Sequence, residues 1–256
     1  MPGALEWRGV AASLGRMSRR VLAIGHRGAA AHMPENTMPS FEKALALGAD
    51  ALEFDVALTR DGVAVVIHDD TLDRTTNGHG PVEEATLGEL RRLDAGSWKG
   101  IAAHLPTLDE VLAAYAHRTL LNLEIKHSGR RAEIVDACAQ AVHRADALGA
   151  VVFSSFDHDA LRLLRRVLPP ARIGVLSVTL GLEDAMRCAG EVGAENLHPP
   201  AALVNGELVR RAREAGLRVW TWTVNAEDQI RRVIDAGVDG VFSDFPERVV
   251  AVRAST

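Results

Sequence analysis

The chain has 256 residues, of which 47% are hydrophobic and 25% are charged, and its formal net charge at pH 7 is −5. This composition is typical of a folded globular enzyme, and the acidic balance gives no reason to expect nucleic acid as a partner, because proteins that bind nucleic acid usually carry a basic surface. The two cysteines, Cys138 and Cys188, are too far apart in sequence to suggest a disulfide framework or a metal cluster, which favours a reducing compartment.

The first 20 residues carry four arginines but lack an uninterrupted apolar block with a cleavage site. No apolar run in the chain approaches the roughly 18 residues of a membrane span. We therefore expect residues 1–20 to be a loose leader and residues 21–256 to form one domain. The protein is expected to be cytoplasmic, without a membrane partner, and its oligomeric state stays open.

Eight strand-like runs alternate with helical segments along this domain. They are residues 21–25, 51–57, 120–126, 151–154, 172–176, 194–197, 218–223 and 239–243. Glycines that end helical segments just before the next strand give a recurring helix-stop signal. These are Gly48, Gly149, Gly193, Gly216 and Gly237. Eight such units in a chain of this size predict an α/β fold, a closed (β/α)8 barrel of the TIM type, over an open sheet with a Gly-rich phosphate loop.

One segment interrupts this rhythm after the second strand. A short run at 63–67 follows Asp61-Gly62 and is predicted to turn back on the second strand as a hairpin. The polar, turn-rich segment of about 71–106 comes next. It is either a small insertion that lies over the strand ends, such as a lid, or a long surface connection.

Polar residues before several helical segments predict helix caps, because their side chains can accept hydrogen bonds from the free backbone N–H groups of the first turn. The residues concerned are Thr86 with Glu89, Thr107 with Glu110, Asn205 and Asn225. The two Thr–Glu pairs have the spacing of capping boxes.

The second predicted strand carries two carboxylates on one face. Because side chains alternate along a strand, Glu53 and Asp55 point the same way and their apolar neighbours point the other way. In the next strand Glu124 shares a face with Asn122 and Lys126. Buried carboxylates are costly unless they are paired or bind a metal. The three acids are therefore predicted to bind one divalent cation, Mg²⁺ or Ca²⁺, with a solvated strand face as the alternative.

Two histidines follow strands that end on the same side of the predicted barrel. His26 follows the first strand, and the hairpin folds His68 back beside Glu53. Barrel enzymes place their sites at this end, and an imidazole is suited to proton transfer near neutral pH. Arg27 and Lys126 add two positive charges that suit a phosphate, although internal salt bridges are the alternative for Lys126.

The ordered set of motifs resembles the glycerophosphodiester phosphodiesterase family from about Val21 to Pro246. The matching segments are His26-Arg27-Gly28, Pro34-Glu35-Asn36-Thr37, Glu53-Phe54-Asp55-Val56, Asp61-Gly62 with His68-Asp69, Thr71 to Trp98, Leu123-Glu124-Ile125-Lys126, Ser154-Ser155-Phe156 and Trp222-Thr223-Val224-Asn225. The resemblance implies metal-dependent hydrolysis of small glycerophosphodiesters to glycerol 3-phosphate and an alcohol.

The same resemblance implies roles for individual residues. His26 and His68 would be the general acid and base, with Arg27 and Lys126 on the phosphate. The metal ligands would be Glu53, Asp55 and Glu124. Glu35 would orient the residues that surround the metal, and Asn36 or Thr37 would cap the first helix.

Other side chains are expected to lie near the pocket. By the resemblance, Trp222 would wall the glycerol site, with barrel packing as the alternative, and Trp220 is expected to face the opposite side. His79 and His198 could line the same pocket, although histidines at such positions more often have a structural role.

Two other functions compete with this prediction. A phospholipase-type relative would act on lysophospholipid or sphingomyelin head groups. The full insertion, the missing secretion signal and the missing disulfide pair argue against it. A barrel that binds phosphodiesters without cleaving them is the second alternative, and the presence of every implied catalytic residue argues against it.

Overall fold

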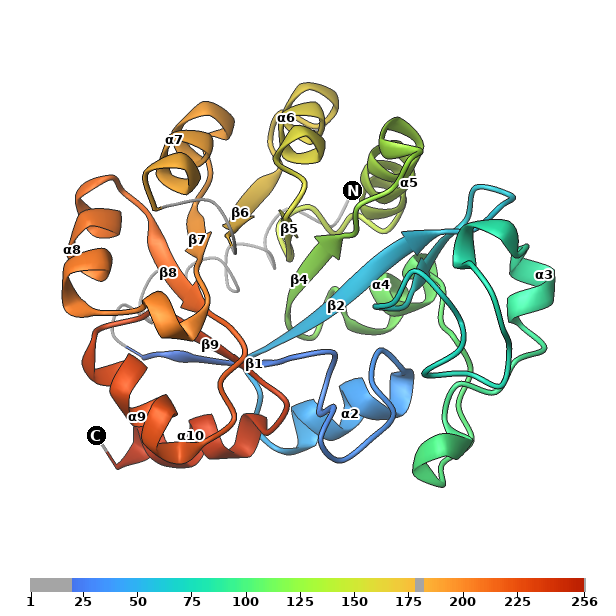
Figure 1. Cartoon of the computed structure of the whole chain (residues 1–256), viewed down its shortest axis with the longest axis horizontal. Helices are drawn as coiled ribbons and strands as arrows, with labels where there is room; N and C mark the ends of the chain where they lie inside the picture. The colour runs from blue at the N-terminus through green and yellow to red at the C-terminus, as the bar shows by residue number, and fades with distance from the viewer. Residues whose placement is uncertain (1–19, 178–181, 256) are drawn as a thin grey trace, which may run out of the picture.

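The strand-like runs form the eight parallel strands of a closed barrel in the computed structural model, which describes residues 20–177 and 182–255 (Figure 1). The strands are β1 (Leu22–Gly25), β2 (Ala51–Leu58), β4 (Leu120–Ile125), β5 (Val151–Ser155), β6 (Arg172–Leu176), β7 (Asn196–His198), β8 (Arg218–Thr221) and β9 (Gly240–Ser243). Because β1 pairs with both β2 and β9, the sheet closes on itself. The predicted TIM-type barrel is confirmed. The expected leader lies outside the described residues, except for Arg20.

A helix follows each parallel strand before the chain enters the next one. These helices are α2 (Met38–Ala46), α4 (Leu108–Tyr115), α5 (Arg131–Arg144), α6 (His158–Val167), α7 (Leu182–Val192), α8 (Gly206–Glu214), α9 (Glu227–Asp235) and α10 (Pro246–Ala254). A short 3-10 turn, η3 (Ala201–Leu203), precedes α8. Within the described part of the chain, no helix combines the length and the apolar composition that a membrane span requires.

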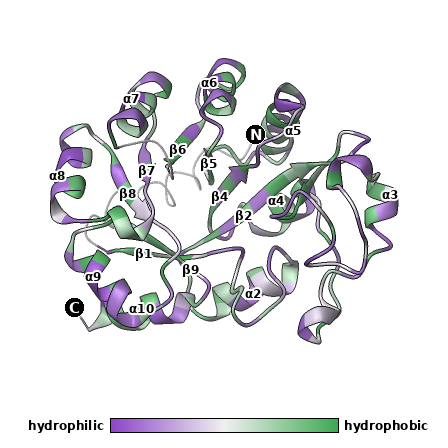
Figure 2. Cartoon of the chain, in the orientation of Figure 1, coloured by the Kyte–Doolittle hydropathy of each residue, from purple (hydrophilic) through white to green (hydrophobic). Residues whose placement is uncertain are grey.

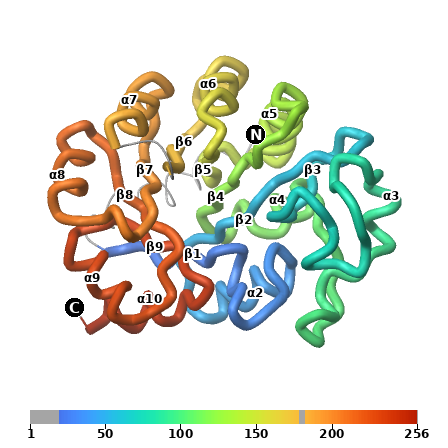
Figure 3. Tube along the Cα trace, viewed as in Figure 1, coloured from blue at the N-terminus to red at the C-terminus, as the bar shows by residue number. Residues whose placement is uncertain are grey.

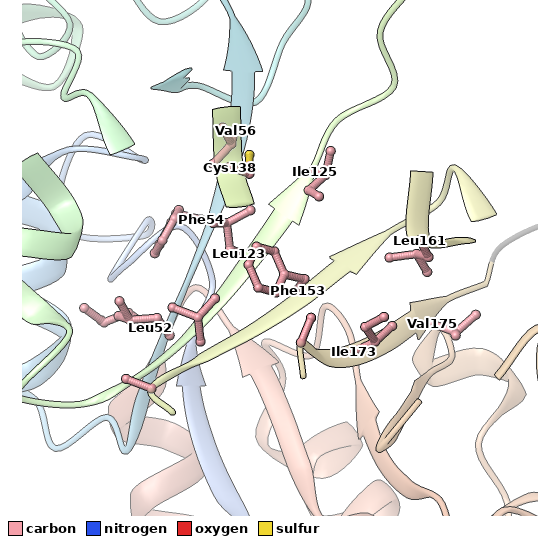
Figure 4. Packing of buried hydrophobic residues seen from close by; sticks show 14 of the residues in the cluster. Leu52, Phe54, Val56, Leu123, Ile125, Cys138, Phe153, Leu161, Ile173 and Val175 are labelled. Carbon is pink, nitrogen blue, oxygen red and sulfur yellow. The ribbon is translucent and has the colours of Figure 1, made fainter. Parts of the chain in front are cut away.

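The helices pack on the outer face of the barrel through a continuous apolar core. They carry hydrophilic residues as well as hydrophobic ones, as Figure 2 shows. Figure 4 shows part of this core, in which side chains of β2 and β4 belong to the same cluster as Cys138 of α5. Phe54 and Leu123 are fully buried there. Burying such a side chain stabilises the fold by about 1.5–3 kcal/mol.

The predicted hairpin is present as β3 (Ala64–Val66), which pairs antiparallel with the end of β2. The 71–106 insertion follows it and contains η1 (Val82–Glu84), α3 (Leu87–Leu90) and η2 (Ser97–Lys99). Figure 3 shows this segment beside β3. It has an apolar cluster shared with β3, formed by Val65, Ile67, Leu72, Val82, Leu90, Ala95 and Leu105. The insertion returns to its starting point, because the Val66 N–H donates to the carbonyl of Pro106.

The helix signals were correct at most positions. Positive φ angles are found at four of the five predicted glycines, Gly48, Gly193, Gly216 and Gly237. The prediction was wrong at Gly149, because α5 ends earlier, where Asp146 takes the left-handed conformation with φ 50°. The two capping boxes and the Asn205 cap are present.

Two predicted caps are absent. Thr37 stands at the N-cap of α2, but its side chain makes no capping hydrogen bond and donates to the carbonyl of Pro34 instead. Ala226 occupies the N-cap of α9, because the side chain of Asn225 is engaged at the end of β9. Both departures occur beside the carboxyl ends of the strands, where polar side chains have partners outside their own helix.

The inner face of the barrel changes from apolar to polar along the strands. Trp220 is fully buried among apolar residues of the interior, and Trp222 packs against the same cluster. The expectation that Trp220 faces the opposite side was therefore wrong. The two indoles are two residues apart in an extended segment, so they share one face.

Candidate active site

Three carboxylates gather inside the carboxyl-terminal end of the barrel. Glu53 and Asp55 lie on the same face of β2, and the pairing of β2 with β4 places Asp55 directly beside Glu124. One oxygen from each carboxylate lies within 4.8 Å of the others. Glu53 is 4% exposed, Asp55 is 1% exposed and Glu124 is 9% exposed. The group offers hard oxygen ligands that are largely buried.

The electrostatics of these acids suit a cation-binding site. Burial and the two neighbouring carboxylates raise the pKa of Glu53 well above its ordinary value. Burial and the charge of Asp55 raise the pKa of Glu124 to about 7. Burial also opposes ionisation of Asp55, but the positive charges of Arg27 and Lys126 outweigh it and lower the pKa of Asp55. A divalent cation would relieve this repulsion, so the donor set suits Mg²⁺ or Ca²⁺.

Arg27 reaches two of the three acids because of an unusual backbone conformation. Its φ of 53° lies in the left-handed region, which a residue with a side chain adopts at a cost of about 1–3 kcal/mol. The backbone N–H of Arg27 donates to Glu53 Oε2 at 2.8 Å. Its guanidinium Nε lies 3.2 Å from Asp55 Oδ2. This conformation therefore places the backbone N–H of Arg27 on one carboxylate and its guanidinium charge beside the next.

Lys126 follows β4 and also faces the acids. Its Nζ lies 3.2 Å from Glu124 Oε1 and 3.8 Å from Asp55 Oδ1. Burial lowers the pKa of Lys126, but the charges of these two carboxylates outweigh burial and the pKa is raised. The lysine is therefore positively charged next to the acids.

His26 is held by a carboxylate from the other end of the chain. Its Nδ1 lies 2.7 Å from Oδ1 of Asp244, which directly follows β9. The Asn225 Nδ2 donates to Asp244 Oδ2 at 2.6 Å, and the Asp244 N–H donates to Asn225 Oδ1 at 2.9 Å. A carboxylate on Nδ1 favours a proton at that nitrogen and leaves Nε2 to accept or donate another.

His68, which follows β3, is also held by a carboxylate at its Nδ1. Its Nδ1 lies 2.6 Å from Oδ1 of Asp69. Burial lowers the pKa of His68, although the nearby charge of Asp55 acts in the opposite direction. The imidazole is therefore neutral near pH 7 and can accept a proton.

Glu35 and Asn36 lie behind the acids, where Glu35 holds Arg27 and Asn36 holds Asp55. Glu35 Oε1 accepts from Arg27 Nη1 at 2.7 Å. Asn36 Nδ2 donates to Asp55 Oδ2 at 2.9 Å, and its backbone has a positive φ of 57°. Asn36 therefore fixes a candidate metal ligand, and the expected helix-capping role for it or for Thr37 was wrong.

The predicted residues surround a cavity of about 110 Å³ at this end of the barrel. Its lining residues are His26, Arg27, Glu53, His68, Asn122, Glu124, Phe156, Leu176, Trp222, Thr223 and Phe242. The ring of Trp222 packs edge-on against that of Phe156, with centroids 5.4 Å apart. Trp222 thus forms a wall of the cavity, while its Nε1 donates to the carbonyl of His198. Asp55 and Lys126 lie behind the lining residues.

The two further histidines do not line this cavity. His79 is 84% exposed in the insertion and pairs with Asp73. The ring of His198 is fully buried inside the barrel, stacked on Trp220 with centroids 5.2 Å apart. It lies over Gly174, where a Cβ atom would be 2.4 Å from the imidazole. Neither ring nitrogen of His198 has a hydrogen-bond partner among the described residues.

The burial of His198 predicts an acid-sensitive fold. Burial lowers its pKa from 6.5 to about 3, so the unfolded chain binds a proton that the folded chain excludes. Stability is full above pH 6.5 and decreases as the pH falls toward 3, by about 2 kcal/mol between pH 7.5 and pH 5. His198→Phe should lack this component. Urea unfolding of both proteins at the two pH values measures it.

The comparison depends on the change with pH, because any fixed packing cost of the phenylalanine cancels. His143→Phe on the exposed face of α5 is the matched control and should follow the wild type. Equal pH dependence in His198→Phe and the wild type would contradict a neutral, excluded imidazole.

Asp244 had not been singled out from the sequence, and the contacts of Asn225 and Asp69 had not been predicted. Asp244 binds His26 and Asn225, which are both distant in sequence. Asp69 binds its neighbour His68 and also Arg74 of the insertion. Asp244 follows β9 directly, and the rule that drew attention to His26 after β1 applies to it equally. The arginine can offset the charge of a phosphate, the acids can hold a cation, and the two carboxylate-bound histidines can transfer protons to and from ester oxygens.

Comparison with known proteins supports this chemistry. The model of the glycerophosphoryl diester phosphodiesterase family matches residues 26–248. A glycerophosphodiester phosphodiesterase of Caldanaerobacter subterraneus subsp. tengcongensis is 39% identical over 237 residues, which cover 90% of this chain and 97% of that protein. A glycerophosphodiester phosphodiesterase of Bacillus altitudinis is 37% identical over 238 residues, covering 90% and 97%.

Solved structures agree with the sequence comparison. The structure of an Oleispira antarctica phosphodiesterase in complex with the product sn-glycerol-3-phosphate has a TM-score of 0.82 at 32% identity and covers 90% of this chain and 95% of that one. A glycerophosphodiester phosphodiesterase from Agrobacterium tumefaciens has a TM-score of 0.80 at 30% identity and covers 92% and 99%.

Proposed function

This chain belongs to the glycerophosphoryl diester phosphodiesterase family and is a phosphoric diester hydrolase, and on that premise we propose that it hydrolyses glycerophosphodiesters to sn-glycerol 3-phosphate and an alcohol by a metal-dependent, two-histidine mechanism. One observation carries the proposal. Two histidines, each bound by its own aspartate, line the same 110 Å³ cavity as two members of the buried acidic triad.

Glu53, Asp55 and Glu124 are the proposed ligands of one divalent cation, Mg²⁺ or Ca²⁺. Their short mutual separation and their burial support this assignment. When bound, such a cation supplies positive charge for a phosphoryl oxygen and for substrate hydroxyls. Asn36 and the backbone of Arg27 keep two of the carboxylates in place.

Arg27 and Lys126 are the proposed partners of the phosphate. Arg27 lines the cavity, and its planar guanidinium suits a phosphate because it presents several donors in one plane. Lys126 lies behind the lining, so its first role is to balance the charges of Glu124 and Asp55. Glu35 orients Arg27 by accepting a hydrogen bond from Nη1.

His26 and His68 are the proposed proton-transfer pair. Asp244 and Asp69 hold the Nδ1 atoms, so Nε2 is the nitrogen available for chemistry on each ring. One histidine accepts the proton of the attacking oxygen, and the other protonates the departing alcohol. Water and a neighbouring hydroxyl of the substrate both fit this scheme as the nucleophile. Trp222 is the proposed wall of the glycerol site.

A substrate panel tests the proposal directly. With added Mg²⁺ or Ca²⁺, glycerophosphocholine and glycerophosphoethanolamine should be cleaved, with kcat/KM at least tenfold above the values for sphingomyelin and lysophosphatidylcholine. The small cavity and the charged residues in its lining favour the water-soluble diesters. For the glycerophosphodiesters, released glycerol 3-phosphate is measured by a coupled dehydrogenase assay. For sphingomyelin and lysophosphatidylcholine, released choline and phosphocholine are measured.

The panel separates the competing functions. Preference for sphingomyelin or lysophosphatidylcholine would contradict the proposed substrate class and favour a phospholipase. Binding of glycerophosphocholine by calorimetry without release of product would favour a non-catalytic binding protein.

We further propose that residues 21–256 act as one catalytic domain in the cytoplasm on a small soluble substrate. Both cysteines, Cys138 and Cys188, are free, which suits a reducing compartment. The formal net charge of −5 gives no support for binding nucleic acid.

A further inference from the structure

Arg74, in the 71–106 insertion, binds two carboxylates behind the candidate active site. Its Nε and Nη2 lie 2.6 Å and 2.9 Å from the two oxygens of Asp69. Its Nη1 and Nη2 lie 2.8 Å from the two oxygens of Glu35. One guanidinium therefore forms a bidentate ion pair with each carboxylate, although Arg74 is 47% exposed.

Each of these carboxylates holds a residue that lines the cavity. Asp69 binds Nδ1 of His68 at 2.6 Å, and Glu35 accepts from Nη1 of Arg27 at 2.7 Å. The same oxygen of Glu35, Oε1, accepts from Arg27 and from Arg74. Hydrogen bonds and ion pairs therefore connect His68 to Arg27 through Arg74 and the two carboxylates. Arg27 in turn pairs with Asp55.

Without Arg74 both carboxylates would lose a constraint. Asp69 would keep its hydrogen bond with the imidazole but no arginine, and it could rotate toward water, which would free the ring of His68. Glu35 would keep one arginine in place of two, so the position of Arg27 would be less well defined. Arg74 itself does not line the cavity, so any effect on the reaction acts through these neighbours.

The insertion is anchored independently of Arg74. Lys99 donates to the carbonyl groups of Ala30 and Met33 in the loop after β1. Ser128, after β4, donates to Glu83 of η1. The apolar cluster shared with β3 anchors the insertion from inside. Loss of Arg74 should therefore change the site without unfolding the segment.

We propose that Arg74 is a positioning residue that fixes His68 and Arg27 relative to each other, through Asp69 and Glu35. The inference rests on the proposed function, because it assigns Arg74 a part in the same reaction. This role explains what the insertion contributes to the site. The insertion supplies the guanidinium group that links the proton-transfer residue His68 to the phosphate-binding residue Arg27.

Arg74→Ala tests this inference. Its kcat for glycerophosphocholine should fall about 10–100-fold, as is typical when a residue that orients an active-site group is lost. KM should rise by a smaller factor, and the melting temperature should change little. Arg74→Lys keeps the charge but not the planar fork, so it should recover part of the lost kcat. Guanidinium ion, added well below denaturing concentrations, should restore activity several-fold in Arg74→Ala but not in His68→Ala.

Arg91→Ala is the matched control, because Arg91 lies in the same insertion and its Nη2 is 3.0 Å from Glu110, away from the cavity. It should retain wild-type kcat. If Arg74→Ala has the same turnover as the wild type, this inference is overturned but the proposed function is not. A loss of kcat matched by loss of folded protein, without rescue by guanidinium, would also overturn it. Absence of turnover in the wild type would overturn the proposed function and this inference with it.

Discussion

Replacement of His26 or His68 by alanine is expected to lower kcat for glycerophosphocholine by roughly 10²–10⁴-fold, the usual contribution of a general acid or base. Each imidazole lines the cavity and is oriented by a carboxylate. Neither is among the proposed metal ligands, so both variants should still bind the cation. Steady-state kinetics measures the first effect, and titration calorimetry with Mg²⁺ and Ca²⁺ measures the second.

A third histidine provides the matched control. His32 lies in the same loop as His26, but its Nε2 binds Glu247 at 2.9 Å and it does not line the cavity. His32→Ala should therefore keep turnover close to that of the wild type. Near-normal turnover in His26→Ala or His68→Ala would refute the assignment of that residue. Loss of cation binding in either variant would point instead to a ligand role.

Removal of the divalent cation with a chelator is expected to lower turnover on the order of 10³-fold, because a catalytic metal supplies several kcal/mol of charge stabilisation. Addition of Mg²⁺ or Ca²⁺ should restore it. The cation should also raise the melting temperature, because it binds the folded site and not the unfolded chain. Full activity after exhaustive chelation would contradict the metal-dependent mechanism.

The acidic triad predicts that one substitution has opposite effects with and without metal. Without metal, Glu53→Gln removes a carboxyl group whose ionisation is opposed by burial and by two neighbouring carboxylates, so the free energy of unfolding near neutral pH should rise by on the order of 1 kcal/mol. With metal, the same variant should be less stabilised than the wild type, because it has lost a ligand. Thermal melts at several metal concentrations measure both effects.

An exposed acid separates this effect from a general change in charge. Glu207 on α8 is 62% exposed and pairs with Arg210, so Glu207→Gln should respond to metal as the wild type does. Destabilisation of metal-free Glu53→Gln relative to the metal-free wild type would show that repulsion does not dominate at this position.

Residues on strands were the part of the site that the sequence predicted best. The alternation of side chains placed Glu53 and Asp55 together, and it placed Glu124 on the corresponding face of β4. The hairpin brought His68 to the same cavity. Each of these inferences needs only a local repeat and the direction of one strand, and both can be read from a few consecutive residues.

The contacts of the supporting residues could not be predicted in this way. Asp244 meets His26 across 218 positions of sequence, and no local pattern connects the two. Arg74 lies in an irregular segment, where side-chain directions follow the turns of that segment. Asn225 was misjudged because its place before a helix suggested a cap, while the nearby Asp244 offered a charged partner. Tertiary contacts outweighed local preference at all three positions.

The closure of the barrel between β1 and β9 has a consequence for biosynthesis. His26 is made early, but its partner Asp244 directly follows β9, the strand that completes the ring, and β1 pairs with β9 along all four of its residues. A nascent chain on the ribosome therefore carries an unclosed sheet and an unoriented imidazole until Asp244 has emerged. Phosphodiester cleavage should begin only after that moment, so translation itself delays the onset of activity.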